Sequence, residues 1–132
     1  MATIELNAEN LEQTIQDSKT LFIDFWASWC GPCRMFAPVF EAASTKHADV
    51  TFAKLDTEAN AEVAAALEIQ AIPTLMAFRE GILVYREAGA MNASGFEQLI
   101  DAVQALDAED LRRQVDEAHA GHSHAEDAPA EG

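Results

Sequence analysis

Hydrophobic residues recur along the chain at two different spacings, and the change from one to the other predicts alternating strands and helices. Short apolar or alternating stretches are typical of β-strands, and they lie at residues 3–6, 21–26, 50–55, 75–78 and 82–85. Apolar residues three and four positions apart indicate helices, and they lie around residues 11–15, 33–40, 59–67 and 92–103. Asn7 and Asn92 are the expected N-caps of the first and last helix, and Pro38 is expected to kink the second. The predicted order is βαβαβαββα.

The strand at residues 21–26 is a near-continuous apolar run, which is typical of a strand covered on both faces in the centre of an α/β sheet. Asp24 is the only charged residue within it. A turn at Arg79-Glu80-Gly81 predicts that the last two strands form an antiparallel hairpin. We therefore expect one α/β domain ending near Leu106, with a mixed five-stranded sheet flanked by four helices.

Residues 107–132 differ in composition from the rest of the chain. They hold eight acidic residues against two arginines. Leu111 and Val115 predict that the last helix continues for a few turns. From Gly121 onward there is too little apolar surface to offset the entropy of ordering, which predicts disorder. The sequence thus divides into a domain at 1–106 and an acidic C-terminal extension at 107–132.

The net charge of the whole chain limits the classes of molecule that it can bind. It carries 8 Lys and Arg against 23 Asp and Glu, a formal charge of −15. Nucleic acid binding needs cations that neutralise phosphates, and an anionic membrane surface repels an acidic protein, so neither partner is expected. No apolar run approaches the ~20 residues that span a bilayer, and the N-terminus lacks the features of a signal peptide. These observations predict a soluble, cytoplasmic protein.

The only two cysteines, Cys30 and Cys33, are separated by two residues. A disulfide that closes so short a loop adds little stability, so the pair indicates redox chemistry or a metal site. It follows a strand and opens a helix, where free amides and the helix dipole favour a thiolate at Cys30. Pro32 suits the first helical turn. We expect Cys30 to be the exposed nucleophile and Cys33 the resolving thiol.

The run from Asp24 to Met35, DFWASWCGPCRM, resembles the active-site segment of the thioredoxins. Ile72-Pro73-Thr74, the hairpin with Gly81, and Gly89-Ala90 follow at matching separations. The resemblance covers about residues 3–106 and implies a thioredoxin fold and a protein-disulfide reductase. Such a protein donates electrons to cytosolic proteins and maintains cell redox homeostasis by dithiol–disulfide exchange.

The resemblance also implies partners. A thioredoxin reductase, which is an NADPH-dependent flavoenzyme, is expected to recycle the disulfide, and disulfide-containing proteins are the expected substrates. This chain has no G-x-G-x-x-G motif, so we expect it to carry no cofactor of its own. A monomer is expected.

Several other residues acquire roles through the resemblance alone. Asp24 is expected to be a buried acid beneath Cys33, with a raised pKa that lets it accept the Cys33 proton, and Lys54 its neighbouring cation. The alternative for Asp24 is a position at an edge or beside water. A cis peptide is implied before Pro73, and Trp26 is expected inside. The implied substrate surface consists of Trp29, Gly31, Pro32, Ile72, Pro73, Gly89 and Ala90.

Three alternatives remain open from the sequence. His119, His122 and His124 could join the cysteines in a zinc site, but they lie in the segment expected to be flexible, so we predict no metal site. An oxidase or isomerase on the same fold usually has His between the cysteines, whereas Gly31-Pro32 favours a reductase. The third alternative is a binding or holdase module in which turnover is incidental.

Overall fold

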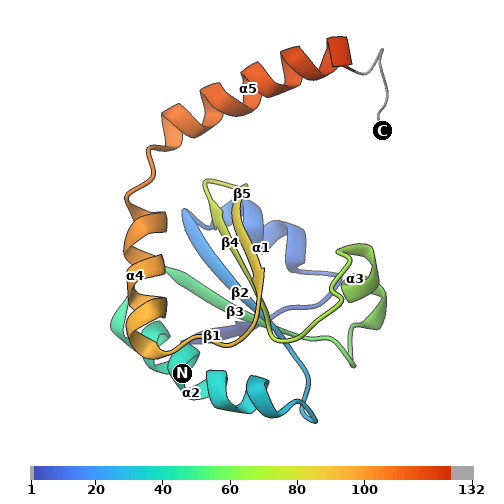
Figure 1. Cartoon of the computed structure of the whole chain (residues 1–132), viewed down its shortest axis with the longest axis vertical. Helices are drawn as coiled ribbons and strands as arrows, with labels where there is room; N and C mark the ends of the chain where they lie inside the picture. The colour runs from blue at the N-terminus through green and yellow to red at the C-terminus, as the bar shows by residue number, and fades with distance from the viewer. Residues whose placement is uncertain (1, 126–132) are drawn as a thin grey trace.

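The computed structural model, which describes residues 2–125 with side chains up to Ala118, contains a mixed five-stranded sheet (Figure 1). Its strands are β1 (Thr3–Glu5), β2 (Thr20–Trp26), β3 (Thr51–Asp56), β4 (Thr74–Arg79) and β5 (Ile82–Ala88). The spatial order is β1-β3-β2-β4-β5, so β2 is central as expected. It pairs in parallel with β3 and antiparallel with β4, and β4 and β5 form the expected hairpin.

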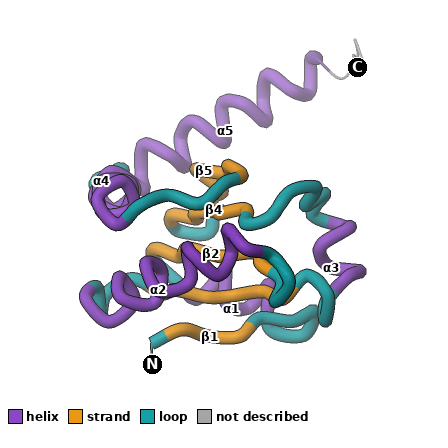
Figure 2. Tube along the Cα trace, turned by 60° about the horizontal axis from the view of Figure 1, so that its bottom comes forward, coloured by secondary structure: helices purple, strands orange, loops and turns teal. Residues whose placement is uncertain are grey.

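Helices cover both faces of this sheet. They are α1 (Leu11–Asp17), α2 (Gly31–Lys46), α3 (Ala61–Ala66), α4 (Ala93–Gln104) and α5 (Ala108–Ala125). In Figure 2, α2 lies in front of the strands and α1 behind them. Among the described residues, no helix has the length and apolar character needed to cross a membrane.

Alternation along β2 explains the two layers. Phe22 packs into the cluster formed with α2 and α4, whereas Leu21, Ile23 and Phe25 pack toward α1 and α3. Because side chains on a strand point alternately to opposite faces, a run this apolar must be covered on both sides. The sequence prediction of a doubly covered central strand is confirmed.

Five phenylalanines form the centre of the α2–α4 side. They are Phe22, Phe36, Phe40, Phe52 and Phe96, all buried. The Phe96 ring contacts the other four, with ring centroids 5.4–6.2 Å apart in stacked and edge-to-face arrangements. The helix that carries Phe96 begins as expected, since Asn92 Oδ1 accepts a hydrogen bond from the Gly95 amide at 2.8 Å.

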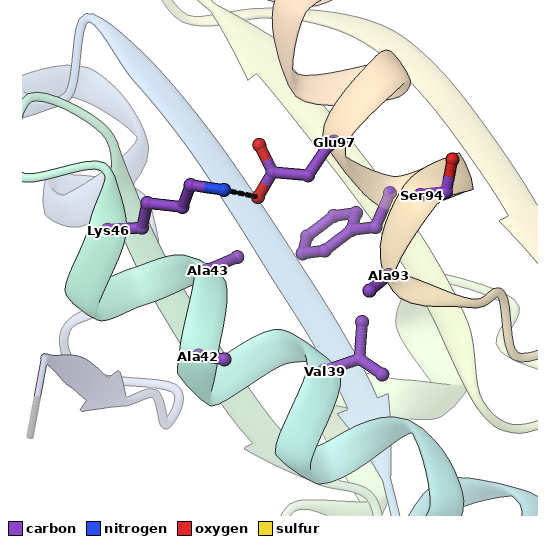
Figure 3. Close-up of a pocket in the computed structure, with 8 residues that line it drawn as sticks. Val39, Ala42, Ala43, Lys46, Ala93, Ser94 and Glu97 are labelled. Carbon is purple, nitrogen blue, oxygen red and sulfur yellow. Dashed lines mark ion pairs between the residues drawn. The ribbon is translucent and has the colours of Figure 1, made fainter.

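Figure 3 shows where α2 and α4 meet, around a cavity of about 310 Å³ whose lining residues include Phe96. At one end of this cavity Glu97 pairs with Lys46, the N–O distance being 3.8 Å. His47 Nε2 lies 2.8 Å from the other oxygen of Glu97. The end of α2 is thereby joined to α4 by polar contacts as well as by apolar packing. α2 also continues through Pro38 without a break.

Three local expectations are wrong. The N-cap of α1 is Asn10, not Asn7, because the two asparagines exchange backbone-to-side-chain hydrogen bonds that form a turn ahead of the helix. The C-terminal extension does not prolong α4: the chain leaves the helix after Gln104 and starts α5 at Ala108. Disorder from Gly121 is contradicted up to Ala125, where α5 ends, and residues 126–132 lie outside the described part.

α5 passes over the end of the β4–β5 hairpin, as Figure 1 shows. A cavity of about 380 Å³ separates it from β5, with Leu83, Val84, Leu111 and Val115 among its lining residues. Arg112 of α5 forms an ion pair of 3.3 Å with Glu80 in the β4–β5 turn. The extension is therefore tied to the domain by an ion pair, and apolar residues of both parts line the space between them.

Truncation of Phe96 to alanine should lower the free energy of unfolding by about 3–5 kcal/mol, because the side chain is completely buried and contacts four other rings. Met35→Ala is the matched control, because Met35 is 75% exposed on α2. It should change stability by no more than about 0.5 kcal/mol. Urea unfolding of both variants measures the difference, and equal losses would contradict this account of the core.

Candidate active site

The two cysteines lie where the central strand passes into α2. β2 ends at Trp26, and α2 starts at Gly31 with Cys30 as its N-cap. The intervening turn is closed by the Cys30 amide, which donates to the Ala27 carbonyl at 3.2 Å, and by Arg34 Nη1, which donates to the Ser28 carbonyl at 2.9 Å. Cys30 and Cys33 form a disulfide, with Cα atoms 5.2 Å apart. Gly31 and Pro32, in the first turn of α2, span the two positions.

A backbone amide in the first turn of α2 contacts the sulfur of Cys30 directly. The Cys33 amide donates a hydrogen bond to Cys30 Sγ at 3.2 Å. This amide is one of the free donors of the helix N-terminus, so it would stabilise negative charge on Cys30 in the reduced protein. The expectation that Cys30 is exposed is wrong for the disulfide form: Cys30 is 4% exposed and Cys33 3%. Both pack against Ala27, Trp26 and Ile72.

A loop distant in sequence closes over the disulfide. The Ile72–Pro73 peptide is cis, as expected, and the Ile72 carbonyl oxygen lies 3.7 Å from Cys30 Sγ. The Pro73 carbonyl accepts a hydrogen bond of 2.8 Å from the Gly89 amide. Gly89 has a φ of +113°, a backbone conformation that glycine adopts most readily. Ala90 follows as an exposed residue.

Two large apolar side chains are exposed near the cysteines in sequence, namely Trp29 at 64% and Met35 at 75%. The Trp29 indole is held in place, since Nε1 donates to Glu58 Oε2 at 2.8 Å. Trp26 is partly buried, so the expected division between an inner and an outer tryptophan is confirmed. An exposed tryptophan next to a cysteine in the chain is suited to contact with another polypeptide.

Asp24 is a completely buried carboxyl in the middle of β2. It is 1% exposed, and neither oxygen has a hydrogen-bond partner among the described residues. Burial raises its pKa to about 7, with the positive charge of Lys54 opposing the rise and the negative charge of Glu41 adding to it. The alternative position of Asp24 at an edge is therefore wrong. A carboxyl that titrates near neutral pH is suited to accept and release a proton.

Lys54 is the register partner of Asp24 on β3, which places the two side chains on the same face of the sheet. Lys54 is the expected cation next to Asp24 in the sheet, but it forms its ion pair with Glu41. Lys54 Nζ lies 3.4 Å from Glu41 Oε2. The ammonium group also lies over the Trp26 ring, 5.1 Å from its centroid.

Sequence reasoning missed Glu41 and Glu58. Glu41 follows Cys33 by eight residues, about two helical turns, so its position on the Cys33 side of α2 could have been found from helical periodicity. No local pattern indicates that Glu58 meets Trp29, because the contact joins two loops. The side chains of His119, His122 and His124, on which the zinc alternative depends, lie outside the described part.

Comparison with known proteins agrees with this geometry. The thioredoxin family model matches residues 2–102. The chain belongs to the thioredoxin family. A thioredoxin of Alicyclobacillus acidocaldarius subsp. acidocaldarius is 45% identical over 105 residues, which cover 78% of this chain and 100% of that one. A mutant thioredoxin from Halobacterium salinarum NRC-1 has a TM-score of 0.73 at 29% identity, covering 80% of this chain and 93% of the other.

A third relative contains more than this domain. A Mycobacterium leprae (strain TN) protein named bifunctional thioredoxin reductase/thioredoxin is 40% identical over 107 residues, which cover 79% of this chain and 23% of that protein. Together with the paired cysteines, family membership identifies the chain as a thiol–disulfide oxidoreductase of the reductase type, with Cys30–Cys33 as its redox-active pair.

The titration of Asp24 should make stability depend on pH. In the folded thioredoxin the carboxyl keeps its proton up to about pH 7, whereas the unfolded chain loses it near the ordinary pKa of 3.8. Between these values the folded state holds one more proton, so stability falls as the pH rises. At about 1.4 kcal/mol per pH unit, the loss due to Asp24 between pH 4 and pH 7 is about 4 kcal/mol.

Urea unfolding of the oxidised protein and of Asp24→Asn from pH 4 to pH 8 measures this loss. The asparagine has nearly the same shape and does not titrate, so the variant should gain stability relative to the parent by about that amount over this range. A difference that stays constant with pH would contradict the assignment.

Proposed function

We propose that reduced Cys30 attacks the disulfide of a substrate protein and that Cys33 completes the reaction. The observation that carries this order is the hydrogen bond from the Cys33 amide to Cys30 Sγ. A donor at the helix N-terminus favours the thiolate on Cys30, and the thiolate is the attacking form. Cys33, one turn further along the helix, has its partner sulfur within bonding distance.

The proposed dithiol–disulfide exchange takes place in two steps. Cys30 Sγ forms a bond to one substrate sulfur, the substrate disulfide breaks, and the other substrate sulfur leaves as a thiolate. Cys33 then transfers its proton to Asp24 and attacks Cys30 Sγ, which forms the Cys30–Cys33 disulfide and releases the second substrate thiolate. Two electrons pass from the dithiol to the substrate. The raised pKa of Asp24, about 7, supports this role as proton acceptor.

The surface around the dithiol is proposed to receive an extended segment of the substrate. Its members are Trp29, Gly31, Pro32, Ile72, Pro73, Gly89 and Ala90. Support comes from the exposure of Trp29 and from the contacts that join the Ile72–Pro73 loop to Cys30 and to Gly89. Flat apolar contacts of this kind recognise a disulfide and its backbone rather than one sequence, so many different proteins could serve as substrates.

Recycling of the disulfide is assigned to a thioredoxin reductase, an NADPH-dependent flavoenzyme. The Mycobacterium leprae relative supports this, because its name combines the reductase and the thioredoxin in one chain. We place the reaction in the cytoplasm, where the thiol pool keeps such a pair reduced. We also infer a monomer of two parts, a catalytic domain at 1–106 and an acidic extension at 107–132. The net charge of −15 disfavours nucleic acid and membranes as partners.

The reduction potential separates a reductase from an oxidase or isomerase on the same fold. Thioredoxins have a reference potential of about −270 mV, a value that belongs to the family and is not inferred from this chain. Equilibration of Cys30–Cys33 with glutathione or dithiothreitol should give a potential close to it. A value about 100 mV higher, toward the oxidants, would overturn the reductase assignment.

The order of attack is tested by trapping. Cys33→Ser should accumulate a mixed disulfide with a disulfide-containing substrate such as insulin, because the first bond forms but nothing resolves it. Cys30→Ser should accumulate far less. Non-reducing gels and mass spectrometry identify the adduct and its site. Equal trapping at both positions contradicts the order, and full biological function in the double serine variant would favour the holdase alternative.

A further inference from the structure

The ammonium group of Lys54 has two acidic neighbours, and it pairs with only one of them. Asp24 is its register partner on the adjacent strand, and Glu41 approaches from α2. Lys54 Nζ lies 3.4 Å from Glu41 Oε2, whereas both oxygens of Asp24 have no hydrogen-bond partner among the described residues. The ammonium group that neighbours Asp24 in the sheet is thus paired with the more exposed of the two acids.

This arrangement is the reverse of what electrostatics alone favours. When Asp24 is ionised it is a buried carboxylate without a partner, and it then attracts a neighbouring ammonium group more strongly than the exposed Glu41 carboxylate does. The Glu41 side chain is 51% exposed and would remain hydrated without Lys54. Other contacts must therefore hold the Lys54 ammonium group in its present position. Two contacts do so: the Glu41 carboxylate and the Trp26 ring, whose centroid is 5.1 Å from Nζ.

We propose that Glu41 is a positioning residue that holds the Lys54 ammonium group away from Asp24, which keeps the Asp24 carboxyl unpaired and able to take up the Cys33 proton. The last part of this statement rests on the function proposed above. The holding of Lys54 by Glu41 stands on the described contacts alone.

Removal of the Glu41 charge should lower the pKa of Asp24 for two reasons. Lys54 becomes free to pair with Asp24, and an opposite charge within 4–6 Å lowers a carboxyl pKa by about 1–3 units. The negative charge of Glu41, which itself adds to the raised pKa of Asp24, is also lost. The charged groups that act on Asp24 in the disulfide form are Lys54 on β3 and Glu41 on α2. Neither cysteine titrates in the disulfide form.

The test is a carboxyl ¹³C NMR titration of Asp24 in the oxidised full-length protein, which needs no turnover. Glu41→Gln should lower the titration midpoint by one pH unit or more. Glu41→Asp keeps the charge and should recover most of the parent midpoint. Glu97→Gln is the matched control, since Glu97 is a partly exposed acid paired with Lys46 on the α4 side, and it should leave the midpoint unchanged.

A double-mutant cycle shows whether Glu41 acts through Lys54. In a Lys54→Met background, which removes the ammonium group but keeps an unbranched apolar side chain, Glu41→Gln should shift the midpoint by only about a few tenths of a unit, the direct effect of a partly exposed charge. The same shift in both backgrounds would overturn the proposal. So would an unchanged or raised midpoint in Glu41→Gln alone.

Kinetics then separate this proposal from the proposed function. If Asp24 accepts the Cys33 proton, the acidic limb of the pH profile for resolution of the mixed disulfide should move to lower pH in Glu41→Gln by the same amount as the NMR midpoint. The plateau should fall several-fold, because a weaker base assists less. A shifted midpoint with an unchanged pH profile supports the positioning by Glu41 and overturns the proton-acceptor role of Asp24.

Discussion

The burial of β2 on both faces is the constraint from which the rest of the site follows. A strand at the centre of the sheet needs a helical layer on each side, and the crossover that leaves its carboxyl end must begin one of those helices. α2 therefore starts next to the end of β2, and its free amides point at the residue that caps it. The same burial shields Asp24 from bulk solvent and raises its pKa to about 7, so one strand sets both the place of the dithiol and the proton affinity of this acid.

The features that were predictable from the sequence are those that depend on local periodicity or on a specific motif. The central strand, the hairpin, the Asn92 cap and the cysteines at a helix start all have signals within a few residues. Pro73 and Asp24 were placed through resemblance to the thioredoxins, since nothing local marks a cis peptide or an acid in a central strand as functional. The agreement for the cis peptide and for the burial of Asp24 therefore reflects the resemblance rather than local pattern analysis.

The misses have a common physical origin in contacts between segments far apart in the chain. Cys30 is covered because the Ile72 loop closes over it from another part of the fold, and a helix N-terminus alone does not reveal that. Glu41 and Lys54 meet across a helix and a strand, so the pairing that leaves Asp24 alone depends on tertiary packing. α5 separates from α4 although the apolar spacing of Leu111 and Val115 resembles a continuation.

The position of α5 beside β5 has a consequence for self-association. The outer strands of an open sheet carry unpaired backbone groups that can recruit a strand from another chain, and proteins shorten or cover such edges. Here the two edges differ: β1 has three residues and offers few such groups, whereas β5 has seven. The longer edge is the one that α5 accompanies, tied to the β4–β5 turn by Arg112 and Glu80. α5 thus takes up space beside the first residues of this edge, where a strand of a second chain would otherwise have to approach.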